Sequence, residues 1–243
     1  MSAISNLAIT LGNQGKLDEA ACMEQKVLEE RQRIFGDEHP DTMSAMTNLA
    51  IKLGDQGMLD EAVCMEQKVL EKRQRILGDE HPDTVLVMHN LAITLSNQGK
   101  LDEAACMQQK VLEKRQRILG DEHPDTVTAM TDLAITLRDQ RKLSEASAIQ
   151  QEALEKLQPI LGDEHPDTVT AMSNLAKMLG HQGRHDEAAT IQHEVLEKRM
   201  RILGGEHPDT STATSNLAIT AVRIYSIQTK ALFMDKLEGL KII

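Results

Sequence analysis

One seven-residue segment, Gly-Asp-Glu-His-Pro-Asp-Thr, returns along the chain at a fixed interval of 42 residues, with one change in its fifth copy. A constant period of this size is typical of a solenoid, in which each repeat packs only against its neighbours. We therefore predict a stack of copies of one structural unit. The His-Pro pairs that mark the period are His39-Pro40, His81-Pro82, His123-Pro124, His165-Pro166 and His207-Pro208.

A complete unit predicts two helices. The apolar residues from Met46 to Leu53 follow the i, i+3, i+4, i+7 spacing of a helix buried along one stripe, which Gln56-Gly57 ends. We call this helix A. A longer amphipathic pattern, helix B, runs from Leu59 to Leu77 with either Met65 or Glu66 in its buried stripe, and ends at Gly78.

The recurring segment is the expected connector between helix B and the next helix A. Pro82 cannot continue a helix, and Asp83 or Thr84 can cap the following one. The charges in helix B agree with this reading, because Asp60-Glu61 lie in its first turn and basic residues in its last turns. The fold class is therefore all-α, an α-solenoid of 42-residue helix-turn-helix repeats.

The same register divides the chain. We expect one continuous array over residues 1–218, followed by a degenerate apolar tail over residues 219–243 that either forms a C-terminal helix folded over the last repeat or is the frayed end of a longer array. Met1 falls inside a helix A, which favours a fragment. The expected repeats are 1–42, 43–84, 85–126, 127–168, 169–210 and a partial sixth at 211–218.

Composition excludes several kinds of partner. The net charge of −11, with 38 acidic and 27 basic residues, argues against nucleic acid or an anionic membrane. The sequence has two Phe, one Tyr and no Trp, which leaves almost no stacking platform for bases or sugars. It shows no signal peptide and no run of about 18 apolar residues, so we expect a cytoplasmic protein.

Neither the cysteines nor the histidines indicate a metal site or a cofactor, and we expect none. Cys22, Cys64 and Cys106 occupy equivalent positions in successive repeats, roughly 10 Å apart, too far for a disulfide or for one shared ion. The connector histidines are better explained as turn residues that bond backbone or cap a helix. No nucleophile–base constellation stands out either, so we do not expect an enzyme.

Leu49-Ala50, Leu53, Gly57, Leu59, Ala62 and Val69-Leu70 fall at the spacing of the tetratricopeptide repeat. The period of 42 together with Leu-Gly-Asp-Glu-His-Pro-Asp-Thr resembles the kinesin light chain subtype, and is especially similar to the C-terminal arrays of fungal NOD-like receptors. This resemblance covers about residues 1–218. It implies a right-handed superhelix with helix A on the concave face, used to hold a peptide or a partner protein.

The resemblance also implies where a peptide would bind. In similar proteins, the Asn that directly precedes the first buried Leu-Ala pair of helix A often bonds the peptide backbone. An amide side chain suits this role because it can both donate and accept a hydrogen bond. Ser, Thr, His and Ile surround this row instead of the cations of a carboxylate clamp, with Lys177 the main exception. The predicted groove residues are Asn6, Asn48, Asn90, Asp132, Asn174, Asn216, Thr47, His89, Thr131, Ser173 and Lys177.

Two irregularities occur in the fourth repeat. Arg141 replaces the Gly of the turn between helices A and B, and Pro159 replaces an Arg near the end of helix B. We expect Pro159 to kink helix B or end it about one turn early.

Two functions are consistent with these observations. The first is a non-catalytic interaction scaffold, of the cargo-adaptor or receptor-sensor type. The second is a structural array that self-associates through its exposed terminal helices and its apolar tail. In either case the expected partner is a protein or peptide.

Overall fold

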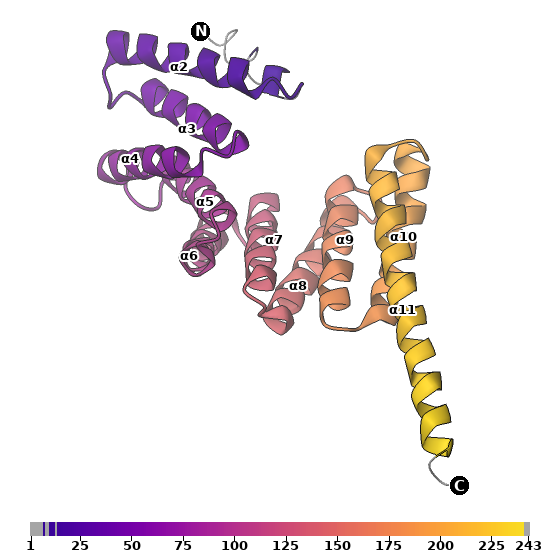
Figure 1. Cartoon of the computed structure of the whole chain (residues 1–243). Coiled ribbons are helices and arrows are strands. Elements are labelled where there is room, and N and C mark those ends of the chain that lie inside the picture. Colours follow the sequence, from indigo (N-terminus) through magenta and orange to yellow (C-terminus); the bar gives the residue numbers. More distant parts are fainter. Residues whose placement is uncertain (1–6, 8–9, 13, 241–243) are drawn as a thin grey trace. The chain divides into compact units, whose positions relative to one another are not determined.

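The computed structural model describes residue 7, residues 10–12 and residues 14–240, with side chains described as far as residue 230. Within these residues the chain is a succession of α-helices joined by short turns (Figure 1). The helices are α2 (Leu17–Phe35), α3 (Pro40–Asp55), α4 (Leu59–Leu77), α5 (Pro82–Asn97), α6 (Leu101–Leu119), α7 (Pro124–Asp139), α8 (Leu143–Leu161), α9 (Pro166–His181), α10 (His185–Leu203) and α11 (Pro208–Leu240).

The predicted all-α solenoid of helix-turn-helix repeats is confirmed. Odd-numbered helices α3 to α9 are A helices of 16 residues, and even-numbered helices α2 to α10 are B helices of 19 residues. From α2 to α6 and from α7 to α11 each helix packs against the next, and A helices of adjacent repeats also touch, α3 with α5 and α7 with α9. The chain divides into two compact units, Met1–Asp121 and Glu122–Ile243.

The core of each repeat lies between its helices and consists of aliphatic residues. Leu49 and Ala50 of α3 are buried, as are Val69 of α4 and Val87 of α5. Glu66, not Met65, belongs to the fully buried stripe of α4. Among the described residues, none of the helices combines the length and apolar character needed to span a bilayer.

The stripe predicted for helix B extends too far at its C-terminal end. Ile76 and Leu77 are 45% and 36% exposed.

The two irregularities leave the repeat intact. Arg141 takes the left-handed conformation of the glycine it replaces, with φ of 67°. The prediction that Pro159 ends helix B early is wrong, because α8 ends at Leu161, 42 residues before the end of α10. Pro159 lies in the exposed last turn, where it removes only one backbone bond, and the buried Leu154 and Leu157 hold the helix in place.

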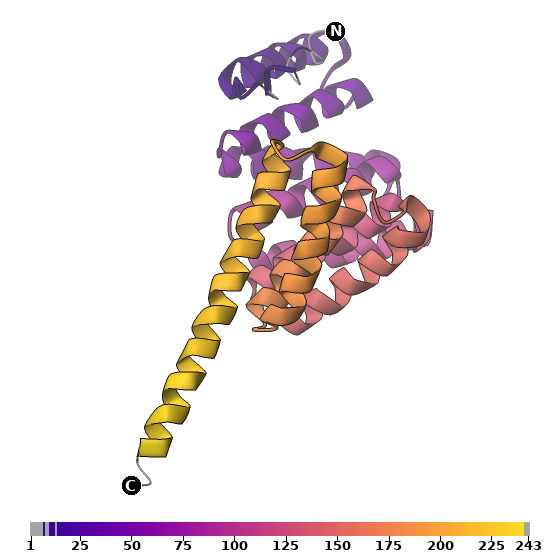
Figure 2. The same cartoon turned by 90° about the vertical axis from the view of Figure 1, so that its right-hand side faces the viewer.

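The C-terminal segment does not form a separate helix folded over the last repeat. Residues 208–240 are one continuous helix, α11, which extends well past the end of α10 (Figure 2). No Gln-Gly turn interrupts it after residue 218, because Ile224 and Tyr225 stand where other repeats have that pair. Its side chains Val222, Tyr225 and Ile227 are 68%, 70% and 53% exposed.

Candidate binding surface on the A helices

The connector histidines cap the A helices. In His81, the side-chain Nδ1 accepts a hydrogen bond of 3.2 Å from the backbone N–H of Asp83, and the equivalent histidines at 39, 123, 165 and 207 do the same. This confirms their reading as turn or capping residues. Asp83 and Thr84 are not the caps: both already lie inside α5, whose N-terminal cap is His81.

A row of arginines on the B helices braces the connectors. Arg73 of α4 donates from Nη1 to the carbonyl oxygen of Asp83 over 2.7 Å, ten residues further on. Burial lowers the pKa of this guanidinium, and the nearby Asp83 carboxylate raises it. Arg31 and Arg199 make the same bond, at 2.7 Å and 2.9 Å. The guanidinium thus ties the end of one repeat to the start of the next.

In α8 this arginine is missing. Leu157 occupies the register position of Arg31, Arg73, Arg115 and Arg199, and it has no group that could donate to the Asp167 carbonyl. A comparison of the repeats at the 42-residue period could have shown this change. Pro159, two residues later, is the more conspicuous departure from the repeat, and Leu157 was not predicted as a functional residue.

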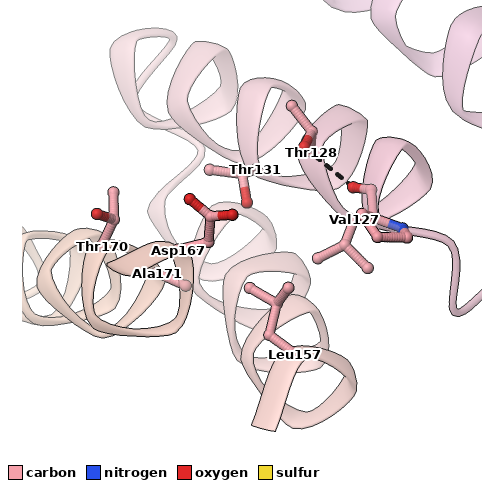
Figure 3. A pocket seen from close by; sticks show the side chains of 8 residues that line it. Val127, Thr128, Thr131, Leu157, Asp167, Thr170 and Ala171 are labelled. Carbon is pink, nitrogen blue, oxygen red and sulfur yellow. Dashed lines mark hydrogen bonds between the residues drawn. The ribbon is translucent and has the colours of Figure 1, made fainter. Parts of the chain in front are cut away.

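A pocket of about 180 Å³ lies beside Leu157, between α7, α8 and α9 (Figure 3). Val127 and Leu157 supply apolar walls, and Thr128 donates its hydroxyl proton to the Pro124 carbonyl oxygen over 3.0 Å, which leaves its oxygen free to accept. The Asp167 carboxylate lies on the same side as the Thr131 and Thr170 side chains. The pocket therefore combines an apolar floor with a rim of oxygen acceptors.

The predicted amide row occupies equivalent positions on the A helices. Asn48, Asn90 and Asn174 are half-buried, and so are Asp132 and Asn216. Asn6 lies outside the described residues. Among the neighbours proposed for the groove, Thr47 and Ser173 are buried, and the Thr47 hydroxyl donates to the Met43 carbonyl oxygen over 3.0 Å. These two side chains have little surface to offer a ligand.

The remaining predicted groove residues are reachable to different degrees. His89 is half-buried and Lys177 is exposed, while Thr131 lines the pocket described above. Burial, Arg138 and Arg199 together lower the pKa of Lys177. The pKa of His181, one turn further along α9, is lowered by burial and by Arg138, Arg141 and Arg223. Cations therefore gather at the C-terminal ends of α7 and α9, with α11 contributing.

A second equivalent row is buried between successive helices. Glu66 is 1% exposed and burial raises its pKa to about 7, against a lowering by its hydrogen bond with Thr94. Gln150 holds the same position in α8 and donates from Nε2 to the Ala171 carbonyl oxygen over 3.3 Å. Both side chains are inaccessible to a ligand, so this row belongs to the packing of the repeats. Its other members are Glu24, Gln108 and Gln192.

Structural comparison finds similar helical arrays. The nearly identical TPR-like repeats of a protein from Podosopora anserina described as a kinesin light chain have a TM-score of 0.71 and 22% identity, covering 83% of this chain and 96% of that one. BtubC (BKLC) from P. vanneervenii has a TM-score of 0.73 and 20% identity, with coverage of 93% and 91%. At these identities the likeness shows the fold alone.

A third similar structure is a Rap protein complexed with competence and sporulation factor, with a TM-score of 0.67, 12% identity, and coverage of 98% of this chain and 74% of that one. Comparison with curated proteins gives no match. Sequence models described as tetratricopeptide repeat match residues 1–75, 107–158, 137–190 and 167–224, and also residues 84–125. The chain belongs to the tetratricopeptide repeat family.

Proposed function

We propose that this chain is a non-catalytic, cytoplasmic scaffold that binds an extended segment of a protein partner along the exposed side of its A helices. Tetratricopeptide repeats generally serve as protein-interaction scaffolds. The observation that carries the proposal is the contact between consecutive A helices, α3 with α5 and α7 with α9, which places the half-buried amides of Asn48 and Asn90 in one register.

The spacing of the amides suits an extended chain. Adjacent packed helices lie roughly 10 Å apart, and an extended segment rises about 3.3 Å per residue. One repeat therefore matches roughly three residues of ligand. The Asn side chains of α3, α5 and α9 can each donate to a carbonyl and accept from an N–H, while Asp132 of α7 can accept from an N–H. Such bonds hold the backbone without demanding one side-chain sequence.

The test uses dodecapeptides selected from a random display library on the immobilised full chain. Their affinities are then measured for the wild type and for the triple variant Asn48→Ala, Asn90→Ala, Asn174→Ala. We expect at least a tenfold loss of affinity with unchanged helicity. The matched control replaces exposed amides of the B helices, Gln67→Ala, Gln109→Ala and Gln151→Ala, which should leave binding intact.

Equal peptide affinities for the wild type and the A-helix triple variant would contradict the proposal that the Asn row binds the peptide backbone. Loss of affinity in the B-helix control alone would move the binding surface to the other side of the array. The cellular setting is a finer proposal: the array is the recognition part of a cargo adaptor or of a receptor of the fungal NOD-like type. The connector sequence of this chain resembles the connectors of such receptors.

The exposed face of α11 favours a second candidate, self-association. Ile219, Val222, Tyr225 and Ile227 are each more than half exposed, and the corresponding helices α7 and α9 are covered by a following B helix. In sedimentation over a range of concentrations, the wild type would dimerise and the variant Val222→Asp, Tyr225→Asp would stay monomeric. A monomeric wild type at all concentrations would remove this candidate.

A further inference from the structure

We infer that the pocket beside Leu157 binds an arginine side chain of the partner segment, at the place where the other repeats hold an arginine of their own. This inference rests on the proposed function, because the pocket lies on the A-helix surface and includes Thr131. It adds the chemical class of one partner residue, a guanidinium, and one specificity-determining position, Leu157.

The array itself supplies the template. In three junctions a guanidinium lies between a B helix and the next A helix, donating to the carbonyl oxygen of the Asp after His-Pro. Arg115 is buried at the same position in a fourth. The pocket at Leu157 shares part of its lining positions with the pocket beside Arg199, with Leu157 in place of Arg199 and Asp167 in place of Asp209, and it adds Thr131 from α7 and Thr170 from α9. The junction at Leu157 therefore keeps the Asp167 connector and a pocket beside it, and lacks the guanidinium that the chain supplies at the other junctions.

The size and polarity of the pocket fit this side chain. A volume of about 180 Å³ corresponds to roughly six molecules of liquid water, at about 30 Å³ each. The methylene groups of an arginine would lie against Val127 and Leu157. Its planar head, which only donates, would meet the Asp167 carbonyl and carboxylate and the Thr128 and Thr131 oxygens.

Charge also favours a cationic ligand here. The Asp167 carboxylate is exposed on the rim, and the chain as a whole carries a net charge of −11. The positive end of the α9 dipole opposes a cation, but the buried Arg73 overcomes the same opposition at the start of α5. Lys177 and Arg138 lie at the other end of the A helices, so they do not compete for the pocket.

The test is a titration of the ¹⁵N-labelled full chain with N-acetyl-arginine methylamide, followed by NMR. We expect saturable shifts of the amides of Thr128, Thr131 and Thr170. The neutral isostere N-acetyl-citrulline methylamide should bind at least tenfold more weakly, because it lacks the charge that strengthens the hydrogen bonds. Equal binding of arginine and citrulline, or no saturable shift of these amides, would overturn the inference.

Two variants locate the site. Leu157→Arg fills the pocket from within with the residue that the other repeats carry, so it should fold and should reduce binding at least tenfold. Asp167→Asn keeps the backbone and removes the rim charge, so it should weaken arginine binding by about fivefold to tenfold. Unchanged binding in both variants would contradict the inference. The reciprocal variant Arg199→Leu should create a second arginine site near Thr170.

The titration separates this inference from the proposed function. If arginine binds in a Leu157-dependent manner while no selected peptide depends on the Asn row, the pocket stands and the amide row fails. If selected peptides depend on the Asn row and bind equally with arginine or citrulline, the scaffold function stands and the arginine pocket fails.

Discussion

The junction of α4 with α5 and the junction of α8 with α9 are built on the same backbone and carry different chemistry. The first has a buried acid, Glu66, and an arginine, Arg73, that bonds the Asp83 carbonyl. In the second, Gln150 donates to the Ala171 carbonyl, and Leu157 replaces the arginine and lines a pocket. Helix lengths and the 42-residue register are identical in both.

This comparison shows that packing in the array tolerates exchanges at single register positions. The aliphatic core and the histidine caps fix each repeat, so one side chain at a junction can change without moving its neighbours. The exchanges alter two separate properties. The Glu66 position controls the stability of a junction, and the Arg73 and Leu157 position controls whether a guanidinium of the chain itself bonds the connector carbonyl.

The largest expected effect is at Glu66. Its pKa is raised from 4.5 to about 7, so the folded state prefers the protonated acid. The cost of ionisation is absent below pH 4.5, grows as the pH rises from 4.5 to 7, and is complete above 7. Glu66→Gln should therefore stabilise the protein by roughly 2–3 kcal/mol at pH 8 and by little at pH 4.5, measured by urea unfolding.

The reciprocal change sharpens the comparison. Gln150→Glu places the acid in the α8–α9 junction and should destabilise the protein more at pH 8 than at pH 5. Glu71→Gln, an exposed position on α4, is the matched control and should change little at any pH. A Glu66→Gln effect that is the same at both pH values would contradict the account of a buried acid.

A smaller effect is expected when the two junctions are made alike at the arginine position. Arg73→Leu removes the 2.7 Å bond to the Asp83 carbonyl and should destabilise the protein by about 1.5 kcal/mol in urea unfolding. Arg75→Leu removes an exposed ion pair with Glu38 and should cost less than about 0.5 kcal/mol. Equal losses in the two variants would mean that the buried guanidinium does not brace the connector.

The turn before α8 offers a third comparison between repeats. Arg141 has φ of 67°, and Gly99 has φ of 80° at the equivalent position. Arg141→Gly removes left-handed strain of about 1–2 kcal/mol and adds chain entropy to the unfolded state, for a net stabilisation of about 1 kcal/mol. Gly99→Arg should show the opposite sign. Thermal unfolding measures both, and a loss of stability in Arg141→Gly would refute the strain.

The smallest effect is expected at the caps. His123 accepts from the Asp125 N–H over 3.1 Å, so His123→Ala should destabilise the protein by roughly 0.5–1 kcal/mol. His123→Asn keeps an acceptor and should restore most of the loss. Denaturant midpoints measure the difference, and an Asn variant no better than the Ala variant would show that the ring acts through packing and not through its nitrogen.

The period of 42 residues was enough to predict the helices, the turns and the order of the repeats. The apolar stripe of each helix and the connector marked by His-Pro indicate the same helix boundaries in every repeat. The period did not predict that α8 would continue through Pro159. The low helix propensity of proline was considered alone, without the packing of the buried Leu154 and Leu157 that holds α8 in place. The caps were assigned to Asp83 or Thr84, which are commoner capping types than His81.

The candidate site was predictable only in part. The helical period placed the Asn row on the A helices, but it could not show that Thr47 and Ser173 are buried, because their burial depends on the packing of neighbouring helices. The pocket at Leu157 depends on residues from three helices. Only the register comparison with Arg73 and Arg199 marks it in the sequence.

The most direct test of the A-helix surface is hydrogen exchange of the full chain with and without a selected dodecapeptide. We predict slower exchange in α3, α5, α7 and α9, with the B helices unchanged. Protection confined to α4, α6, α8 and α10, or to α11, would contradict the assignment of the binding surface.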